Sequence, residues 1–261
     1  MANPKAGIRP YLRALSGWAW NRQNDAKTHG LSLQEETLTE MLLLRIAKDC
    51  KSLGLQVKMF TRHEEKRNGA DWEWFVKGQR CSIGYRIQAK RLYHAGPLRG
   101  QYGGHDPKGP QTAKLIKDAG TNNIPIYIFY NHSSTTVFGG RRSRGFRGPS
   151  YWGCSYASAS SVKAANSRKP SDLVTHMHPW HELFNHCILA QKKAAETAAS
   201  ANILRADGRE AIPSDPQQDG EPAWIQMLGN ATDIEGYLRE HDLAGVAYID
   251  ATNAKLDWSA E

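Results

Sequence analysis

Residues 69–91 read GADWEWFVKGQRCSIGYRIQAKR and contain the two segments on which the fold prediction depends. Apolar and polar side chains alternate over residues 71–76 (DWEWFV) and again over residues 81–90 (CSIGYRIQAK), which is the period of two typical of β-strands. The KGQR sequence between them supplies a turn. We therefore expect the two segments to pair as an antiparallel hairpin.

The flanking segments extend this hairpin to the order α-β-β-β-α-β. Ser32 and Glu35 have the spacing of a capping box, which predicts a helix that runs to about Leu53 and stops at Gly54. Alternation over residues 55–60 predicts a strand, residues 110–120 a second helix, and IPIYIFY at 124–130 a strand buried on both faces. The sequence thus predicts an α/β fold with a mixed sheet flanked by helices.

The rest of the chain is assigned around this core. Residues 1–30 form an N-terminal segment with an amphipathic helix over 8–24, and residues 31–190 form the core domain, with a basic loop at 139–149. Residues 191–261 form a C-terminal α/β extension, in which 205–222 is a flexible polar loop. Its last part contains a helix near 232–240 and the strand-like AGVAYID, which either rejoins the main sheet or packs as a small extension.

The composition favours a polyanionic partner. Lys and Arg outnumber Asp and Glu by 34 to 26, which gives a net charge of +8 and a pI near 9.3. The charge does not distinguish DNA from RNA. The chain has no run of ~18 apolar residues and no N-terminal apolar block, so we expect an intracellular protein without a membrane span. Four widely spaced cysteines are expected to be reduced thiols.

An acid, an amide and an amine converge on one face of the predicted hairpin. Gln88 and Lys90 share a strand face, Asp71 and Glu73 share a face of the preceding strand, and the turn brings Asp71 close to Gln88. A carboxylate and an amide oxygen can hold Mg²⁺, and a lysine can orient water, so this set suits phosphodiester hydrolysis. Glu73 is either a second ligand or a solvent-facing carboxylate.

The strings GADWEW at 69–74 and RIQAKR at 86–91 resemble the PD-(D/E)xK superfamily of restriction-endonuclease-like nucleases. The core of that superfamily is α-β-β-β-α-β, with the acid on the second strand and an (E/D)xK or QxK pair on the third. The QxK form looks like the Mrr-type branch, and GADWEW…RIQAK…PIYIFYN is similar to an uncharacterised bacterial family near it. The resemblance covers roughly residues 30–131 and is moderately specific.

The resemblance implies a Mg²⁺-dependent nuclease, with Mn²⁺ as a substitute, that acts on nucleic acid, expected to be DNA. It implies Asp71, Gln88 and Lys90 as catalytic residues and a glutamate of the first helix beside the metal. Glu36 and Glu40 share a helix stripe with Leu43 and Ala47, so both are expected to point inward, and the choice between them stays open. Defence against foreign DNA in the bacterial cytoplasm, a sensor or activator partner and a homodimer are further expectations.

Several arginines are expected to contact phosphates, namely Arg91, Arg141, Arg142, Arg144 and Arg147. Two alternatives remain. Because a glutamine stands where most relatives carry an acid, the first is a catalytically inactive nucleic-acid-binding module of the same fold. The second is a zinc-binding interaction protein organised by Cys154, His176, His178, His181, His186 and Cys187.

Overall fold

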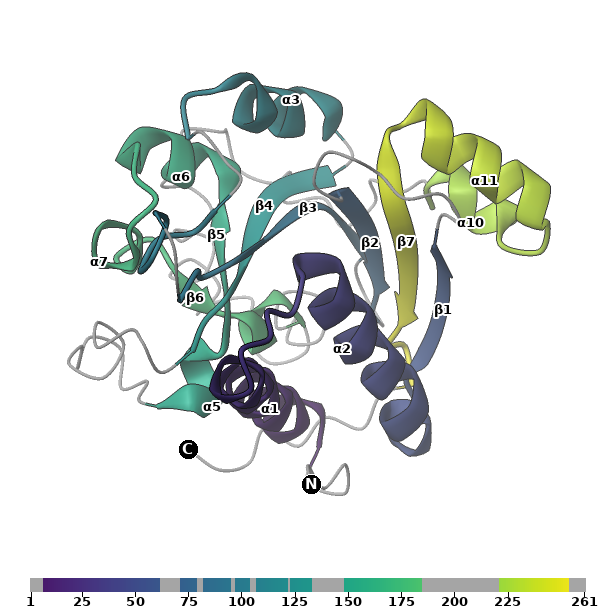
Figure 1. Ribbon diagram of the computed structural model, residues 1–261. Coiled ribbons are helices and arrows are strands. Elements are labelled where there is room, and N and C mark those ends of the chain that lie inside the picture. The colour runs from purple at the N-terminus through teal and green to yellow at the C-terminus, as the bar shows by residue number, and fades with distance from the viewer. Residues whose placement is uncertain are drawn as a thin grey trace, which may run out of the picture.

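A computed structural model describes residues 7–61, 71–78, 82–94, 97–103, 107–121, 123–132, 148–184 and 221–253. It shows a seven-stranded mixed sheet with helices on both faces (Figure 1). The strands are β1 (Gln56–Thr61), β2 (Asp71–Lys77), β3 (Ser82–Arg91), β4 (Asn123–Tyr130), β5 (Cys154–Ser158), β6 (His178–Pro179) and β7 (Leu243–Asp250). The helices are α1 (Ile8–Thr28), α2 (Glu35–Asp49), α3 (Pro110–Asp118), α5 (Pro149–Trp152), α6 (Ala159–Ala165), α7 (Pro170–Leu173), α10 (Ala223–Met227) and α11 (Ala231–Glu240), with 3₁₀ turns η2 (Cys50–Leu53) and η3 (Trp180–Phe184).

The strand order is β1-β7-β2-β3-β4-β5-β6. The predicted hairpin is confirmed, because β2 and β3 pair in antiparallel fashion, and β4 then runs parallel to β3. The three strands after the first predicted helix are not all neighbours, however. The C-terminal strand β7 lies between β1 and β2, antiparallel to the first and parallel to the second (Figure 1). The predicted boundary at residue 190 therefore does not separate two sheets, since the C-terminal segment supplies an interior strand.

Helix α2 ends as predicted and begins differently. It passes into η2 and stops at Gly54, whose left-handed backbone (φ 82) suits glycine. The predicted capping box is wrong, because the helix begins at Glu35 after Gln34 and no side chain caps it. The Ser32 hydroxyl instead accepts a hydrogen bond from Nη1 of Arg91, and the Glu35 carboxylate accepts one from the Arg91 backbone N–H at 3.3 Å. Arg91 of β3 thus binds both residues, Ser32 through its guanidinium and Glu35 through its backbone N–H.

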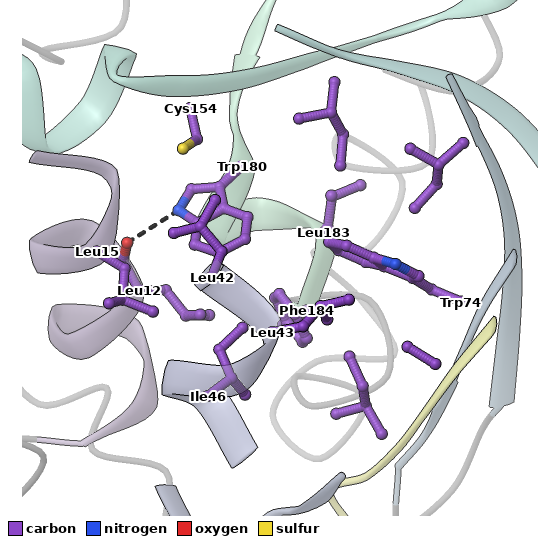
Figure 2. Packing of buried hydrophobic residues seen from close by; sticks show 14 of the residues in the cluster. Leu12, Leu15, Leu42, Leu43, Ile46, Trp74, Cys154, Trp180, Leu183 and Phe184 are labelled. Atoms are coloured by element: carbon purple, nitrogen blue, oxygen red, sulfur yellow. Dashed lines mark hydrogen bonds between the residues drawn. The ribbon is translucent and has the colours of Figure 1, made fainter. Parts of the chain in front are cut away.

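Helices α1 and α2 cover one face of the sheet. Figure 2 shows leucines of both helices packed around Trp180 and, farther along the same cluster, Trp74 beside Leu183. Nε1 of Trp180 donates a hydrogen bond to the Leu12 carbonyl oxygen at 2.9 Å. The strands contribute Trp72 of β2 and Ile87 of β3, together with the residues two positions along each strand, which point to the same face. Each buried side chain of this size stabilises the fold by about 1.5–3 kcal/mol. This cluster makes α1 part of the main body.

The contact between α1 and α5 requires glycine at position 153. A Cβ there would lie 1.9 Å from the Ser16 carbonyl oxygen and 2.9 Å from the Pro149 carbonyl oxygen. The Ser16 hydroxyl fixes the same contact, since it accepts a hydrogen bond from the Cys154 N–H at 2.8 Å. The backbones therefore approach too closely for any side chain.

The other face of the sheet carries two apolar clusters with a polar strip between them. One cluster lies under α3, α6 and α7 and includes Tyr127 and Phe129 of β4. The second lies under α10 and α11 and includes Phe75 of β2 and Val246 of β7. The strip consists of Glu73, Arg86, Gln88 and Lys90, all buried. Strand β3 is therefore buried on both faces over residues 84–91, so the solvent-facing alternative for Glu73, which lies opposite Arg86, is wrong.

None of the described helices is both long enough and apolar enough to cross a lipid bilayer.

Candidate active site

Asp71 and Gln88 are direct cross-strand partners in the β2–β3 hairpin. Asp71 opens β2, and Gln88 stands near the carboxyl end of β3, so the two meet at one end of the sheet. Lys90 follows two residues later and shares the face of Gln88. The predicted convergence of these three positions on one strand pair is thus seen in the register.

Gln88 is the most unusual member of the polar strip. Its side chain is 1% exposed, and neither its amide oxygen nor its amide nitrogen has a hydrogen-bond partner within the described part of the chain. Leaving a buried polar group unsatisfied costs about 1–3 kcal/mol, so such groups are rare in folded proteins. The arrangement fits an amide oxygen that is held ready for a ligand.

Lys90 is also buried, at 3% exposure. In the parallel register of β3 and β4 it is aligned with Phe129, which belongs to the apolar cluster under α3. A buried ammonium group is strongly unfavourable unless negative charge compensates it. The position therefore suits a lysine that works beside an anion.

The glutamates of α2 do not lie as predicted. The buried stripe of the helix consists of Leu38, Thr39, Leu42, Leu43 and Ile46. Glu40 is exposed, so its expected inward orientation is wrong, while Glu36 is half-buried. Glu36 lies near the end of β4: its charge and that of Glu35 help to raise the pKa of Tyr130, although burial is the main cause. Glu36 thus lies at the same end of the sheet as Gln88, but α2 covers the face opposite to the side chains of Gln88 and Lys90.

Glu73 is committed to a structural network. It forms a buried ion pair with Arg86, with Oε1 of Glu73 2.9 Å from Nη1 of Arg86, and Oε2 accepts a hydrogen bond from the Tyr237 hydroxyl at 3.0 Å. Nη2 of Arg86 donates to the His241 carbonyl oxygen at 2.7 Å. Both carboxylate oxygens are thus occupied, which removes Glu73 as a second metal ligand. Opposite charges at directly paired positions of the hairpin were the sequence signal for this contact.

Arg91 is buried rather than presented to solvent. Its Nε lies 3.6 Å from the Glu35 carboxylate, and its guanidinium stacks 4.2 Å from the centroid of the Tyr93 ring. The expected phosphate contact therefore competes with an existing ion pair. The four arginines predicted in the basic loop, Arg141, Arg142, Arg144 and Arg147, lie outside the described residues.

Among the described residues, those of the zinc alternative do not form a metal-binding group. His181 is buried, and burial together with the charges of Arg9 and Arg13 lowers its pKa to about 3. Burial raises the pKa of the Cys154 thiol, which opposes the thiolate form that zinc binds. His178 lies 3.6 Å from Glu182. Over the described ranges no three His, Cys, Asp or Glu side chains form a candidate metal group, and His186 and Cys187 fall outside those ranges.

The chain matches the model of a family of unknown function, DUF6615, over residues 8–255. No curated protein and no solved structure matches it. The match runs from the start of α1 past the end of β7, so it includes every described element of the sheet. The chain with its hairpin site therefore belongs to the DUF6615 family.

Proposed function

We propose that this protein is a metal-dependent nuclease that hydrolyses phosphodiester bonds in nucleic acid, with DNA as the expected substrate. The observation that carries the proposal is the buried amide of Gln88, which has no hydrogen-bond partner among the described residues and stands opposite Asp71 and beside Lys90. An apolar residue at this buried position would stabilise the fold more than a polar one. The chain nevertheless carries polar side chains there, between two apolar clusters.

Asp71 and Gln88 would hold Mg²⁺ at this end of the sheet, since carboxylate and amide oxygens are its preferred protein ligands. Glu36 of α2 belongs to the opposite sheet face, so the helix-borne glutamate is not a ligand in this proposal. The bound ion would neutralise phosphate charge and lower the pKa of the attacking water. A glutamine in place of an acid leaves less negative charge at the site, which predicts weaker metal affinity than two carboxylates would give. The restriction-endonuclease-like core and its Mrr-type branch are part of the same proposal.

Lys90 would act on the reacting groups directly. In the hydrolysis the water oxygen bonds to phosphorus and one P–O ester bond breaks, which leaves a phosphomonoester and a free hydroxyl. The buried ammonium group of Lys90 would orient that water and offset the negative charge that develops on phosphate. The helices on both sides of β3 would keep bulk water away and so strengthen this interaction.

The test is cleavage of supercoiled plasmid in Mg²⁺, Mn²⁺ or EDTA by wild type, Asp71→Ala, Lys90→Ala and Lys77→Ala. Lys77 lies at the other end of the same hairpin and forms an exposed ion pair with Glu221, so its variant is the matched control. We expect metal-dependent cleavage that falls at least about 100-fold in the two site variants and is unchanged in the control. Equal activity in Lys90→Ala and Lys77→Ala would reject the assignment.

Binding without cleavage would favour the inactive nucleic-acid-binding module. The metal is therefore also measured apart from activity, as a Mg²⁺-dependent rise in Tm, which any ligand specific for the folded state produces. We expect this rise in wild type and in Lys77→Ala, and its loss in Asp71→Ala. A protein that needs an activator would still show it.

A further inference from the structure

Charge is distributed unevenly over the two helical layers that flank the polar strip. Over the described residues 107–121 and 159–176, which form α3, α6, α7 and their flanking turns, six Lys and Arg stand against two Asp and Glu. Over residues 221–253, an equal length of chain that forms α10, α11 and β7, one Arg stands against six Asp and Glu. We call these segments the basic layer and the acidic layer. Figure 1 shows α6 and α7 toward one edge of the sheet and α10 and α11 toward the other.

The opposite face of the sheet shows no comparable imbalance. Residues 7–54, which form α1, α2 and η2, carry seven Lys and Arg and five Asp and Glu. Among these described segments the basic excess is therefore concentrated on α3, α6 and α7, on the sheet face that carries Gln88 and Lys90.

The boundary between the two layers lies at the candidate site. The hydroxyls of Thr112 and Tyr127 are hydrogen-bonded at 2.8 Å, which fixes α3 above the β4 position aligned with Gln88. Two residues farther along α3, Nζ of Lys114 lies 2.6 Å from Oδ2 of Asp242, which directly precedes β7. This ion pair joins the basic layer to the acidic layer. The basic layer thus begins beside the strand that carries the candidate site.

The basic layer presents lysines whose charge no described acid compensates. Lys117 on α3 and Lys163 on α6 are exposed, and within the described ranges neither side chain forms an ion pair or a hydrogen bond. The acids of the layer are already engaged. Oδ2 of Asp118 lies 3.7 Å from Nη2 of Arg86, and the Asp172 carboxylate accepts hydrogen bonds from two serine hydroxyls at 2.6 and 2.9 Å, which lower its pKa. The exposed ammonium groups are therefore available to an external anion.

We propose that the basic layer binds the phosphate backbone of DNA and that the acidic layer keeps the DNA on the α3–α6 side of the candidate site. Lysine contacts to phosphates supply most of the sequence-independent affinity of DNA-binding proteins. Fields of opposite sign on two sides of a site orient a charged ligand as it approaches. Solubility alone would be served equally well by interspersed charges, so it does not require this segregation. The inference rests on the proposed function, because it assumes a DNA substrate.

The test compares three exposed lysines of the full chain. Lys117 and Lys163 lie on the basic layer, and Lys48 lies on α2, over the opposite face of the sheet. Each is replaced by glutamate, so the three variants lose the same net charge. Binding of a labelled duplex oligonucleotide is measured by fluorescence anisotropy in EDTA at several salt concentrations, and Tm shows that each variant is folded.

We expect Lys117→Glu and Lys163→Glu each to weaken DNA binding about fivefold or more, because each loses one phosphate contact and adds one repulsion. The slope of log K against log salt should become shallower by about 1 in each. Lys48→Glu should bind DNA as wild type does, since solvent ions screen a charge on the far face. The double variant Lys117→Glu/Lys163→Glu should multiply the two losses, as separate contacts do.

Equal affinity of the three single variants, or no DNA binding by wild type, would overturn the proposal. The two proposals fail separately, because binding in EDTA requires no metal. Binding that depends on Lys117 and Lys163 without metal-dependent plasmid cleavage supports the docking surface and rejects the nuclease. Metal-dependent cleavage together with equal DNA affinity in all three variants rejects the docking surface alone.

Discussion

Glu73 and Arg86 form an ion pair across the β2–β3 hairpin, with 2.9 Å between oxygen and nitrogen and both side chains almost fully buried. The pair lies on the same sheet face as Gln88 and Lys90, between the two apolar clusters. Through Tyr237 and the His241 carbonyl oxygen it ties the C-terminal helix α11 and the turn after it to the hairpin. The network thus joins α11, the last of the described helices, to the strands that carry the candidate site.

Glu73→Gln should destabilise the protein strongly. Removing one charge of a buried pair leaves the other uncompensated, which costs about 3–5 kcal/mol in free energy of unfolding. Urea denaturation measures this loss. Glu235→Gln is the matched control, because it breaks the exposed Glu235–Arg239 pair on α11, whose expected contribution is about 0.5 kcal/mol or less. Similar losses in both variants would show that the buried network does not hold the C-terminal segment in place.

Gln88→Met should separate stability from function. The substitution removes an amide without a hydrogen-bond partner among the described residues and keeps the shape of the side chain, so the free energy of unfolding should rise by about 1–2 kcal/mol in EDTA. The Mg²⁺-dependent rise in Tm and the cleavage should both be lost. Gln23→Met is the control, because Gln23 donates to the Asn131 carbonyl oxygen and its loss should destabilise the fold. A less stable Gln88→Met protein would indicate that Gln88 has a structural role.

Acid should destabilise the protein through His181. Burial and two arginines lower its folded pKa to about 3, below the unfolded value near 6.5. Above the unfolded pKa this histidine is neutral in both states, and its stabilising contribution is complete. As the pH falls from about 6.5 toward 3, His181 binds a proton in the unfolded state but not in the folded state. The free energy of unfolding therefore decreases by up to about 1.4 kcal/mol per pH unit. Denaturation at about pH 7 and about pH 5 should show a smaller loss in His181→Gln than in wild type.

Two glycine substitutions should have opposite effects. Gly153→Ala places a Cβ against the Ser16 carbonyl oxygen of α1 and should cost several kcal/mol or prevent folding, since both neighbours are backbone atoms. Gly236→Ala lies within α11 where a Cβ meets open space, so it should stabilise by about 0.5–1 kcal/mol. Thermal denaturation of both variants checks the pair. A tolerated Gly153→Ala would mean that the Ser16 carbonyl oxygen of α1 lies farther from residue 153 than 1.9 Å from the Cβ position.

The sequence by itself determined the local elements and the hairpin at the centre of the site. Alternating side chains and a short turn specify β2 and β3, and from them the pairing of Asp71 with Gln88 followed within a few residues. The helix that stops at Gly54, the helix α3 and the buried strand β4 were equally readable. Each of these features depends on residues close to one another in the chain, so their propensities and periodicity can be recognised in the sequence alone.

Only the tertiary structure decided what lies next to these elements. β7 enters between β1 and β2 because its apolar residues complete clusters on both faces, which no local pattern reveals. The helices over the far face of β3 bury the polar strip, so that Glu73 pairs with Arg86 and the Gln88 amide has no hydrogen-bond partner among the residues that the structure describes. Arg91 likewise forms hydrogen bonds with Ser32 and Glu35, which therefore do not form the predicted capping box. Burial and charge pairing depend on segments far apart in the chain, and their energies exceed the local preferences that the sequence displays.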